Sequence, residues 1–242
     1  MITETTAIVL KTVDFQESSL IVTVFSEEHG KIALIAKGAK KSRSKFMGMI
    51  QPGRLLSVIY YYKPTRSVQT LSDATYEYRL DSLTMEMSKM AVTMGFLELV
   101  TQVIHEGEIN DPVYQFTRRF LIWLDRQEQV STALFPYLQI RLADLLGLAL
   151  QPVLDNKTGR CYFNISEGTL AGQADAENAV LLTGRQRSFI LDVLESRKAA
   201  VLHHNLDQKE LKSLIHHLDV YFRYHLEGIK PRSSDAIFDL IL

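Results

Sequence analysis

The first 80 residues alternate between short apolar runs and turn residues, a pattern typical of β-strands. Glycine and proline separate the runs, as at Gly30, Gly53 and Pro64. The runs are rich in β-branched and aromatic residues, and the strands they predict lie at 7–10, 20–25, 31–36, 55–62 and 68–71. Five short strands in so few residues predict a small barrel, with the five-stranded OB-fold as first candidate and an SH3-like barrel as second.

After Leu80 the period of the apolar residues lengthens from about 2 to about 3.6, which predicts helices. The first is expected over 83–105. Asp111 and Pro112 are expected to cap and open the second, and Gly147 to end a third over 132–146. Further helices are expected over 184–196, 207–226 and 233–241.

The periodicity is lost between residues 148 and 183, where the sequence predicts a short irregular insert with a hairpin-like pair near 162–168. The expected fold class is therefore α+β and multidomain. A five-stranded OB-fold barrel that binds nucleic acid is expected over 1–80, and a mainly α-helical domain that carries the insert over 81–242.

The charge of the chain is divided along its length. The whole chain has 27 Lys and Arg against 28 Asp and Glu, a formal net charge of -1. Residues 1–80 hold 11 basic and 7 acidic side chains, a net charge of +4, so the remainder has a net charge of -5. The two parts are therefore expected to face different partners.

An acid-free stretch lies between Glu28 and Asp73 and contains nine Lys and Arg residues. Its centre, residues 37–46, is expected to be a mobile, exposed, cationic loop. Such a loop can bind a polyanion by releasing the counterions condensed on its phosphates. The residues predicted to contact phosphates are Lys37, Lys40, Lys41, Arg43, Lys45, Arg54 and Arg66.

Aromatic residues near this stretch are candidates for stacking on bases. Phe46 and Tyr61 are the first choices, and the pair Tyr60 and Tyr62 is the alternative if the strand presents its other face. The competing interpretation is that these rings fill the barrel core or pack on the helical domain.

The sequence shows no catalytic apparatus and no metal site. The glycine spacing of a phosphate loop and the G-x-S-x-G elbow are both absent, so we expect a protein that is not an enzyme. Cys161 is the one cysteine, which excludes an intrachain disulfide and a cysteine-based zinc site. The neighbouring histidines at 203–204 and 216–217 point to different helix faces, and no cofactor is expected.

No uncharged apolar stretch reaches the roughly 18 residues that a membrane span needs. The expectation is a cytoplasmic protein, associated with the nucleoid, with no membrane partner.

Several motifs together resemble the RecO family of bacterial DNA repair and recombination mediator proteins. They are the segments Asp14–Leu20, Val24–Lys31, Ala36–Ser44 and Gln51–Pro52, with weaker similarity in Ile140–Leu148 and Tyr221–Gly228. The resemblance covers nearly the whole chain and is strongest before residue 53.

The resemblance implies a protein that binds single- and double-stranded DNA, anneals complementary strands, and acts with RecR. It also implies that the protein helps RecA to replace the single-strand-binding protein, whose C-terminal tail would contact the helical domain. Some members have a four-cysteine zinc module in the insert, whereas this chain has only Cys161 there. We expect packing of Tyr162, Phe163 and Ile165 to hold the insert instead.

The resemblance implies that the tail of the single-strand-binding protein is acidic and apolar. A site for it would therefore need an apolar groove with a basic rim. The candidates are Arg118, Arg119, Trp123, Arg126 and Arg141. Two other functions remain open from the residues alone: an adaptor whose basic barrel docks an acidic protein, and an RNA-binding OB protein.

Overall fold

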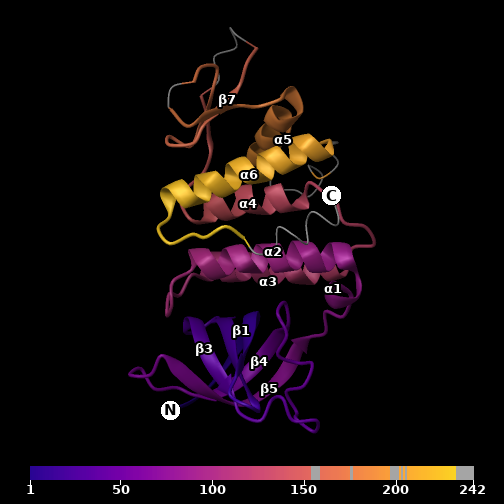
Figure 1. Ribbon diagram of the computed structural model, residues 1–242, viewed down its shortest axis with the longest axis vertical. Helices are drawn as coiled ribbons and strands as arrows, with labels where there is room; N and C mark the ends of the chain where they lie inside the picture. Colours follow the sequence, from indigo (N-terminus) through magenta and orange to yellow (C-terminus); the bar gives the residue numbers. More distant parts are fainter. Residues whose placement is uncertain (154–158, 175–176, 197–201, 203, 205, 233–242) are drawn as a thin grey trace. The chain divides into compact units, whose positions relative to one another are not determined.

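The computed structural model describes residues 1–153, 159–174, 177–196, 202, 204 and 206–232 (Figure 1). The chain forms two compact units, of which the first contains residues 1–128 and the second begins at residue 129. The helix predicted at 233–241 lies outside the described residues.

Five strands open the first unit and close into a barrel. They are β1 (Ile2–Phe15), β2 (Ser19–Ser26), β3 (Gly30–Ala36), β4 (Leu55–Tyr61) and β5 (Val68–Tyr78). The order is β1-β2-β3-β5-β4, with β3 and β5 parallel and the other neighbours antiparallel. This barrel confirms the predicted OB-fold. Alternate side chains of the strands fill its interior, among them Val9, Val22, Val24, Leu34, Leu56, Val58 and Tyr60.

Within residues 1–128, the barrel is followed by three helices, α1 (Ser82–Met85), α2 (Met87–Val103) and α3 (Asp111–Asp125). The single helix predicted over 83–105 is thus two helices, because the backbone at Glu86 is extended. The buried ammonium group of Lys89 stabilises the junction between α1 and α2. It donates to the Ser82 hydroxyl at 3.0 Å and to the Asp125 carbonyl at 3.2 Å, and it lies 3.0 Å from the Glu86 carboxylate.

The cap of α3 is one residue earlier than predicted. The side chain of Asn110 accepts a hydrogen bond from the Val113 amide at 3.2 Å, and Asp111 is the first helical residue, followed by Pro112. Asn and Asp are about equally good caps, so neighbouring Asn and Asp cannot be separated by residue preference alone.

The outer face of β1 and β2 is covered by the helices of the same unit. Ile8 and Phe25 are fully buried, and the Phe25 ring meets the Tyr114 ring edge-on with centroids 5.4 Å apart. The Thr6 hydroxyl donates to the Glu27 carboxylate at 2.8 Å and lies 2.8 Å from the Tyr114 hydroxyl. The barrel and α3 therefore pack against each other at Tyr114.

The first residue of β3, a glycine, touches the segment between α2 and α3. Gly30 has a φ of +62°, and a β-carbon there would lie 1.8 Å from the carbonyl oxygen of Glu108. Beside it, the Gly107 amide donates to the Lys31 carbonyl at 2.8 Å, and the Lys31 ammonium donates to the Thr101 carbonyl at 2.6 Å. Only a residue without a side chain allows this approach.

We expect Gly30→Ala to lower the free energy of unfolding by at least about 2 kcal/mol more than Gly107→Ala, measured by urea denaturation. Gly107 is a matched control because it has a similar φ of +73° but has nothing within 4 Å of the added carbon. Both variants bear the cost of a positive φ, and only the first meets a backbone. Equal losses would show that the close approach does not matter.

Stability should fall at high pH through the buried phenols. Burial raises the pKa of Tyr114 to about 12, against about 10 in an unfolded chain. The folded state therefore holds the proton more tightly, so this contribution is complete below about pH 10 and is lost as the pH rises towards 12. In urea titrations, Tyr114→Phe should reduce this loss, whereas Tyr61→Phe, at an exposed ring, should leave it unchanged. A Tyr114→Phe curve as steep as wild type would contradict this.

The second unit contains α4 (Leu134–Leu145), α5 (Gly184–Glu195) and α6 (Gln208–His225). Gly147 ends α4 as predicted, with a φ of +77°. Its amide donates to the Asp144 carbonyl at 3.1 Å, and the Leu148 amide donates to the Ala143 carbonyl at 2.8 Å, which together form a Schellman motif.

The insert is more ordered than the sequence predicted. Its strands β6 (Gln151–Val153), β7 (Tyr162–Asn164), β8 (Thr169–Ala171) and β9 (Ala179–Leu181) form a sheet in the order β6-β8-β7-β9. β7 and β8 make the expected hairpin. Strands of three residues are too short to show a period, which is why the sequence pattern missed the sheet.

Side chains of α6 anchor this sheet. The buried Phe163 ring packs on Tyr221 with centroids 5.4 Å apart, and the Tyr221 hydroxyl donates to the Leu148 carbonyl at 3.0 Å. A ring nitrogen of His225 lies 2.8 Å from the Ile165 carbonyl. Phe163 and Ile165 are buried, as the packing hypothesis requires, whereas Tyr162 is only half-buried.

The change from strands to helices near residue 80 agrees with the predicted boundary, but α1, α2 and α3 belong to the same compact unit as the barrel. The division into a domain of residues 1–80 and one of residues 81–242 therefore stays a prediction.

Candidate nucleic-acid interface

The predicted phosphate-binding residues lie mainly on one long connection, the cationic loop (residues 37–54, between β3 and β4). Three of its apolar side chains, Ala39, Phe46 and Ile50, are buried in the barrel core at 3%, 5% and 4% exposure. The Lys40 amide donates to the Ser18 carbonyl at 3.0 Å, and the Thr12 hydroxyl donates to the Ile50 carbonyl at 2.7 Å. The expected free loop is thus fastened to the barrel and to the β1–β2 turn.

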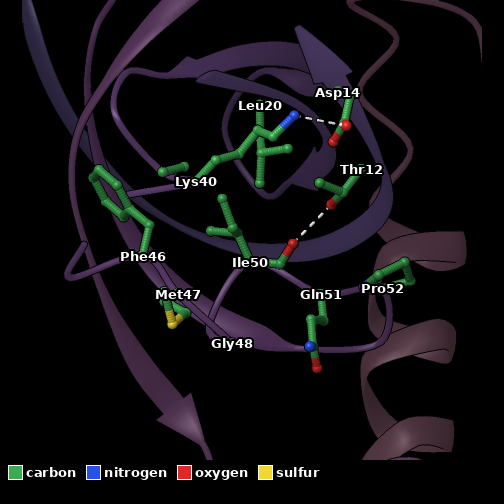
Figure 2. Close-up of a pocket in the computed structure, with 11 residues that line it drawn as sticks. Thr12, Asp14, Leu20, Lys40, Phe46, Met47, Gly48, Ile50, Gln51 and Pro52 are labelled. Atoms are coloured by element: carbon green, nitrogen blue, oxygen red, sulfur yellow. Dashed lines mark hydrogen bonds and ion pairs between the residues drawn. The ribbon is translucent and has the colours of Figure 1, made fainter. Parts of the chain in front are cut away.

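Two lysines of the cationic loop are already paired with acids. The Lys40 ammonium lies 2.7 Å from the Asp14 carboxylate, and a dashed line marks this ion pair in Figure 2. The Lys45 ammonium lies 2.8 Å from the Asp73 carboxylate and donates to the Ser72 carbonyl at 3.0 Å. The hydrogen bond from Lys45 and one from the Ala74 amide lower the pKa of Asp73. Both acids lie outside the acid-free stretch of the sequence. The number of basic residues in that stretch therefore overestimates the number of unpaired cations.

Besides these two lysines, the loop has three further exposed cations, Lys37, Lys41 and Arg43. Within the described ranges none of the three forms an ion pair with a carboxylate. Free cations on a fastened loop can meet phosphates without first breaking a salt bridge. Arg66 and Lys63 are also exposed, on the connection between β4 and β5.

Arg54 occupies a structural position instead. It is 8% exposed, and its guanidinium donates to the Leu80 carbonyl at 3.1 Å, the Asp81 carboxylate at 3.2 Å and the Thr84 hydroxyl at 3.4 Å. These bonds tie the start of β4 to α1, so no phosphate can reach the group without breaking them. Arg54 therefore has a structural role at this junction.

The aromatic residues predicted to stack on bases also divide into buried and exposed ones. Phe46 is buried in the barrel core, with the Lys45 ammonium 5.2 Å from its centroid, and offers no exposed face. Tyr61 is 46% exposed at the end of β4. Tyr60 is fully buried, with its hydroxyl 2.8 Å from Nδ1 of His29. Tyr61 is therefore the ring that we retain.

Two of the residues predicted for a partner's tail have their charges already paired. Arg118 is ion-paired with Glu77, and Arg141, in the second unit, is buried with its guanidinium 2.9 Å from Asp144. On α3, Arg119 is exposed and Trp123 is half-buried, and the exposed Arg126 is the C-cap residue that follows the helix. These last three residues share a helix face because they are spaced by four and three positions.

A groove beside the cationic loop was not predicted from the sequence. It has a volume of about 390 Å³ and is lined by Thr12, Asp14, Leu20, Ala39, Lys40, Phe46, Met47, Gly48, Ile50, Gln51 and Pro52 (Figure 2). The residues come from the β1–β2 hairpin and from the loop. Only the barrel topology, which brings the hairpin beside the loop, could have revealed it.

Within the described part of the chain, no three His, Cys, Asp or Glu side chains lie together as a metal ion would need. No described helix is long and apolar enough to cross a bilayer.

Comparison with known families decides the relationship suggested by the motifs. The family model described as "Recombination protein O N terminal" matches residues 1–78, and "Recombination protein O C terminal" matches residues 86–235. The chain belongs to the RecO family. The first match coincides with the OB-fold barrel, and the two matches together extend over both compact units.

Individual RecO proteins resemble the chain at moderate identity. A protein named "DNA repair protein RecO" from Salinibacter ruber is 34% identical over 154 residues, which cover 64% of this chain but only 58% of that protein. Proteins of the same name from an Exiguobacterium species and from Chloroherpeton thalassium are each 25% identical to this chain. These alignments cover the whole of this chain, and 97% and 100% of the two relatives, respectively.

We expect Arg54→Ala to lower the free energy of unfolding by about 2 to 4 kcal/mol, because it removes a buried charge from Asp81 and the Leu80 carbonyl. Lys41→Ala, at an exposed cation, should change it by less than about 0.5 kcal/mol. Urea denaturation measures both values. If Arg54→Ala left the free energy of unfolding unchanged, Arg54 would again be a candidate for phosphate contact.

Proposed function

We propose that this RecO protein is a DNA repair and recombination mediator that binds single- and double-stranded DNA and anneals complementary strands. The observation that carries the proposal is the set of free cations, Lys37, Lys41 and Arg43, on a fastened loop of an OB-fold barrel. The names of its relatives, DNA repair proteins, support the biological role.

Annealing makes and breaks no covalent bond, so the proposed function does not require an enzyme. Two DNA strands repel each other through their phosphates until cations neutralise them, and the bases must stay free to pair. A loop that holds phosphates from one side meets both needs. The repulsion is already weakened beyond about 10 Å at 0.1 M salt, so the effect must act at contact distance.

The proposed interface consists of the free cations of the cationic loop, with Lys45 as a cation that a phosphate can share with Asp73. Lys40 stays paired with Asp14. Arg66 extends it, and Tyr61 supplies an exposed ring for one base. Each of these residues is exposed, which is the least that contact with DNA requires.

The proposed partners follow from membership of the family. They are RecR, the C-terminal tail of the single-strand-binding protein, and RecA, which is loaded onto DNA coated by that protein at the nucleoid. On α3, the exposed face of Arg119, Trp123 and Arg126 combines two cations with a half-buried indole. This combination suits an acidic and apolar tail better than Arg118 or Arg141, whose charges are already paired.

The triple variant K37A/K41A/R43A should weaken binding to single-stranded DNA similarly for all sequences. It should also lower the slope of log affinity against log salt by up to about 2, since each phosphate contact contributes about 0.7. Fluorescence anisotropy at several salt concentrations measures both quantities. The variant R160A/K209A/R223A, which removes three exposed cations from the second unit, is the matched control and should keep the wild-type slope.

The same measurement separates the alternatives. An unchanged slope in K37A/K41A/R43A would remove the loop from the interface. Tighter binding to RNA of the same sequence would favour an RNA-binding barrel, and no binding to either nucleic acid would favour an adaptor for an acidic protein.

A further inference from the structure

The groove beside the cationic loop has no role in the interface described above. We propose that it takes one unpaired base of a single DNA strand whose phosphates are held by the free cations of the loop. This inference rests on the proposed function and adds that the site distinguishes single strands from duplexes. Its volume of about 390 Å³ lies within the range of roughly 300 to 1,000 Å³ typical of small-molecule sites.

The walls of the groove are suited to a flat, weakly polar ring. Leu20 and Ile50 supply apolar surface, and Figure 2 shows Met47 at the edge of the group. Met47 is 56% exposed, and its flexible thioether makes favourable contacts with aromatic rings. At Gly48 there is nothing within 4 Å of an added β-carbon, so the backbone leaves this side open.

The charges of the groove favour a base over a phosphate. Lys40 and Asp14 neutralise each other within it at 2.7 Å, so its lining has no net charge. A phosphate that entered would face the Asp14 carboxylate, whereas a base carries no charge. The free cations Lys41 and Arg43 follow Lys40 in the same loop and are exposed. Phosphates are therefore expected at these cations, and the attached base in the groove.

Polar groups are available for the edge of the base. The exposed Gln51 amide can both donate and accept, and the Asp14 carboxylate can accept. Bases of a duplex are paired and stacked, and taking one out costs a few kcal/mol. The groove should therefore engage single strands without this cost, and one captured base leaves the neighbouring bases free to pair.

The test compares two oligonucleotides of equal length and equal phosphate number, one with thymine bases and one with abasic residues throughout, by fluorescence anisotropy. Wild-type protein should bind the first about tenfold more tightly, as expected for a stacked base. Equal affinities for both would overturn the base site while leaving the phosphate interface intact. Failure to bind either would count against the proposed function itself.

Variants assign the preference to the groove. Leu20→Trp fills the groove and should lower the preference at least about fivefold, with an unchanged salt slope, because the phosphate contacts remain. Tyr61→Ala removes the ring proposed for a second base and should lower the preference separately. Tyr224→Ala, at an exposed ring of the second unit, is the control and should keep the full preference. If Leu20→Trp does not fold, as judged by its thermal transition, Gln51→Trp at the exposed edge serves in its place.

A folded, groove-filled variant that keeps the full preference would overturn the inference, and loss of the preference in Tyr61→Ala alone would assign the base contact to that ring instead.

Discussion

The structure of the first unit depends on the contact between the start of β3 and the segment between α2 and α3. There the backbone of Gly30 approaches the Glu108 carbonyl more closely than any side chain would allow. With Phe25 packed on Tyr114, this contact covers the outer face of β1 and β2. Within this unit the candidate cations therefore lie on connections that the helices leave exposed, the cationic loop above all.

The cationic loop combines two properties that usually oppose each other. Buried anchors such as Phe46 and Ile50 fix its path, whereas Lys37, Lys41 and Arg43 remain exposed. A loop fixed in this way loses less conformational entropy when it binds a strand. Asp14 and Asp73 neutralise the two remaining lysines, which limits repulsion within the loop in the absence of DNA.

The sequence predicted the parts of the fold that depend on local pattern. The alternation of apolar residues located the five strands, and Gly147 located the end of α4. It could not predict the break at Glu86, which depends on the buried Lys89, or the roles of Arg54 and Phe46, which depend on residues distant in the chain. A cation in an acid-free run looks free until the fold brings Asp14 or Asp73 beside it.

The measurement that tests the central claim most directly is the annealing of two complementary strands, bare or coated with the single-strand-binding protein. We expect wild-type protein to accelerate annealing of both substrates, and K37A/K41A/R43A to lose most of the acceleration while remaining folded. Failure of the wild-type protein to anneal either substrate, or full activity of the triple variant, would contradict the account.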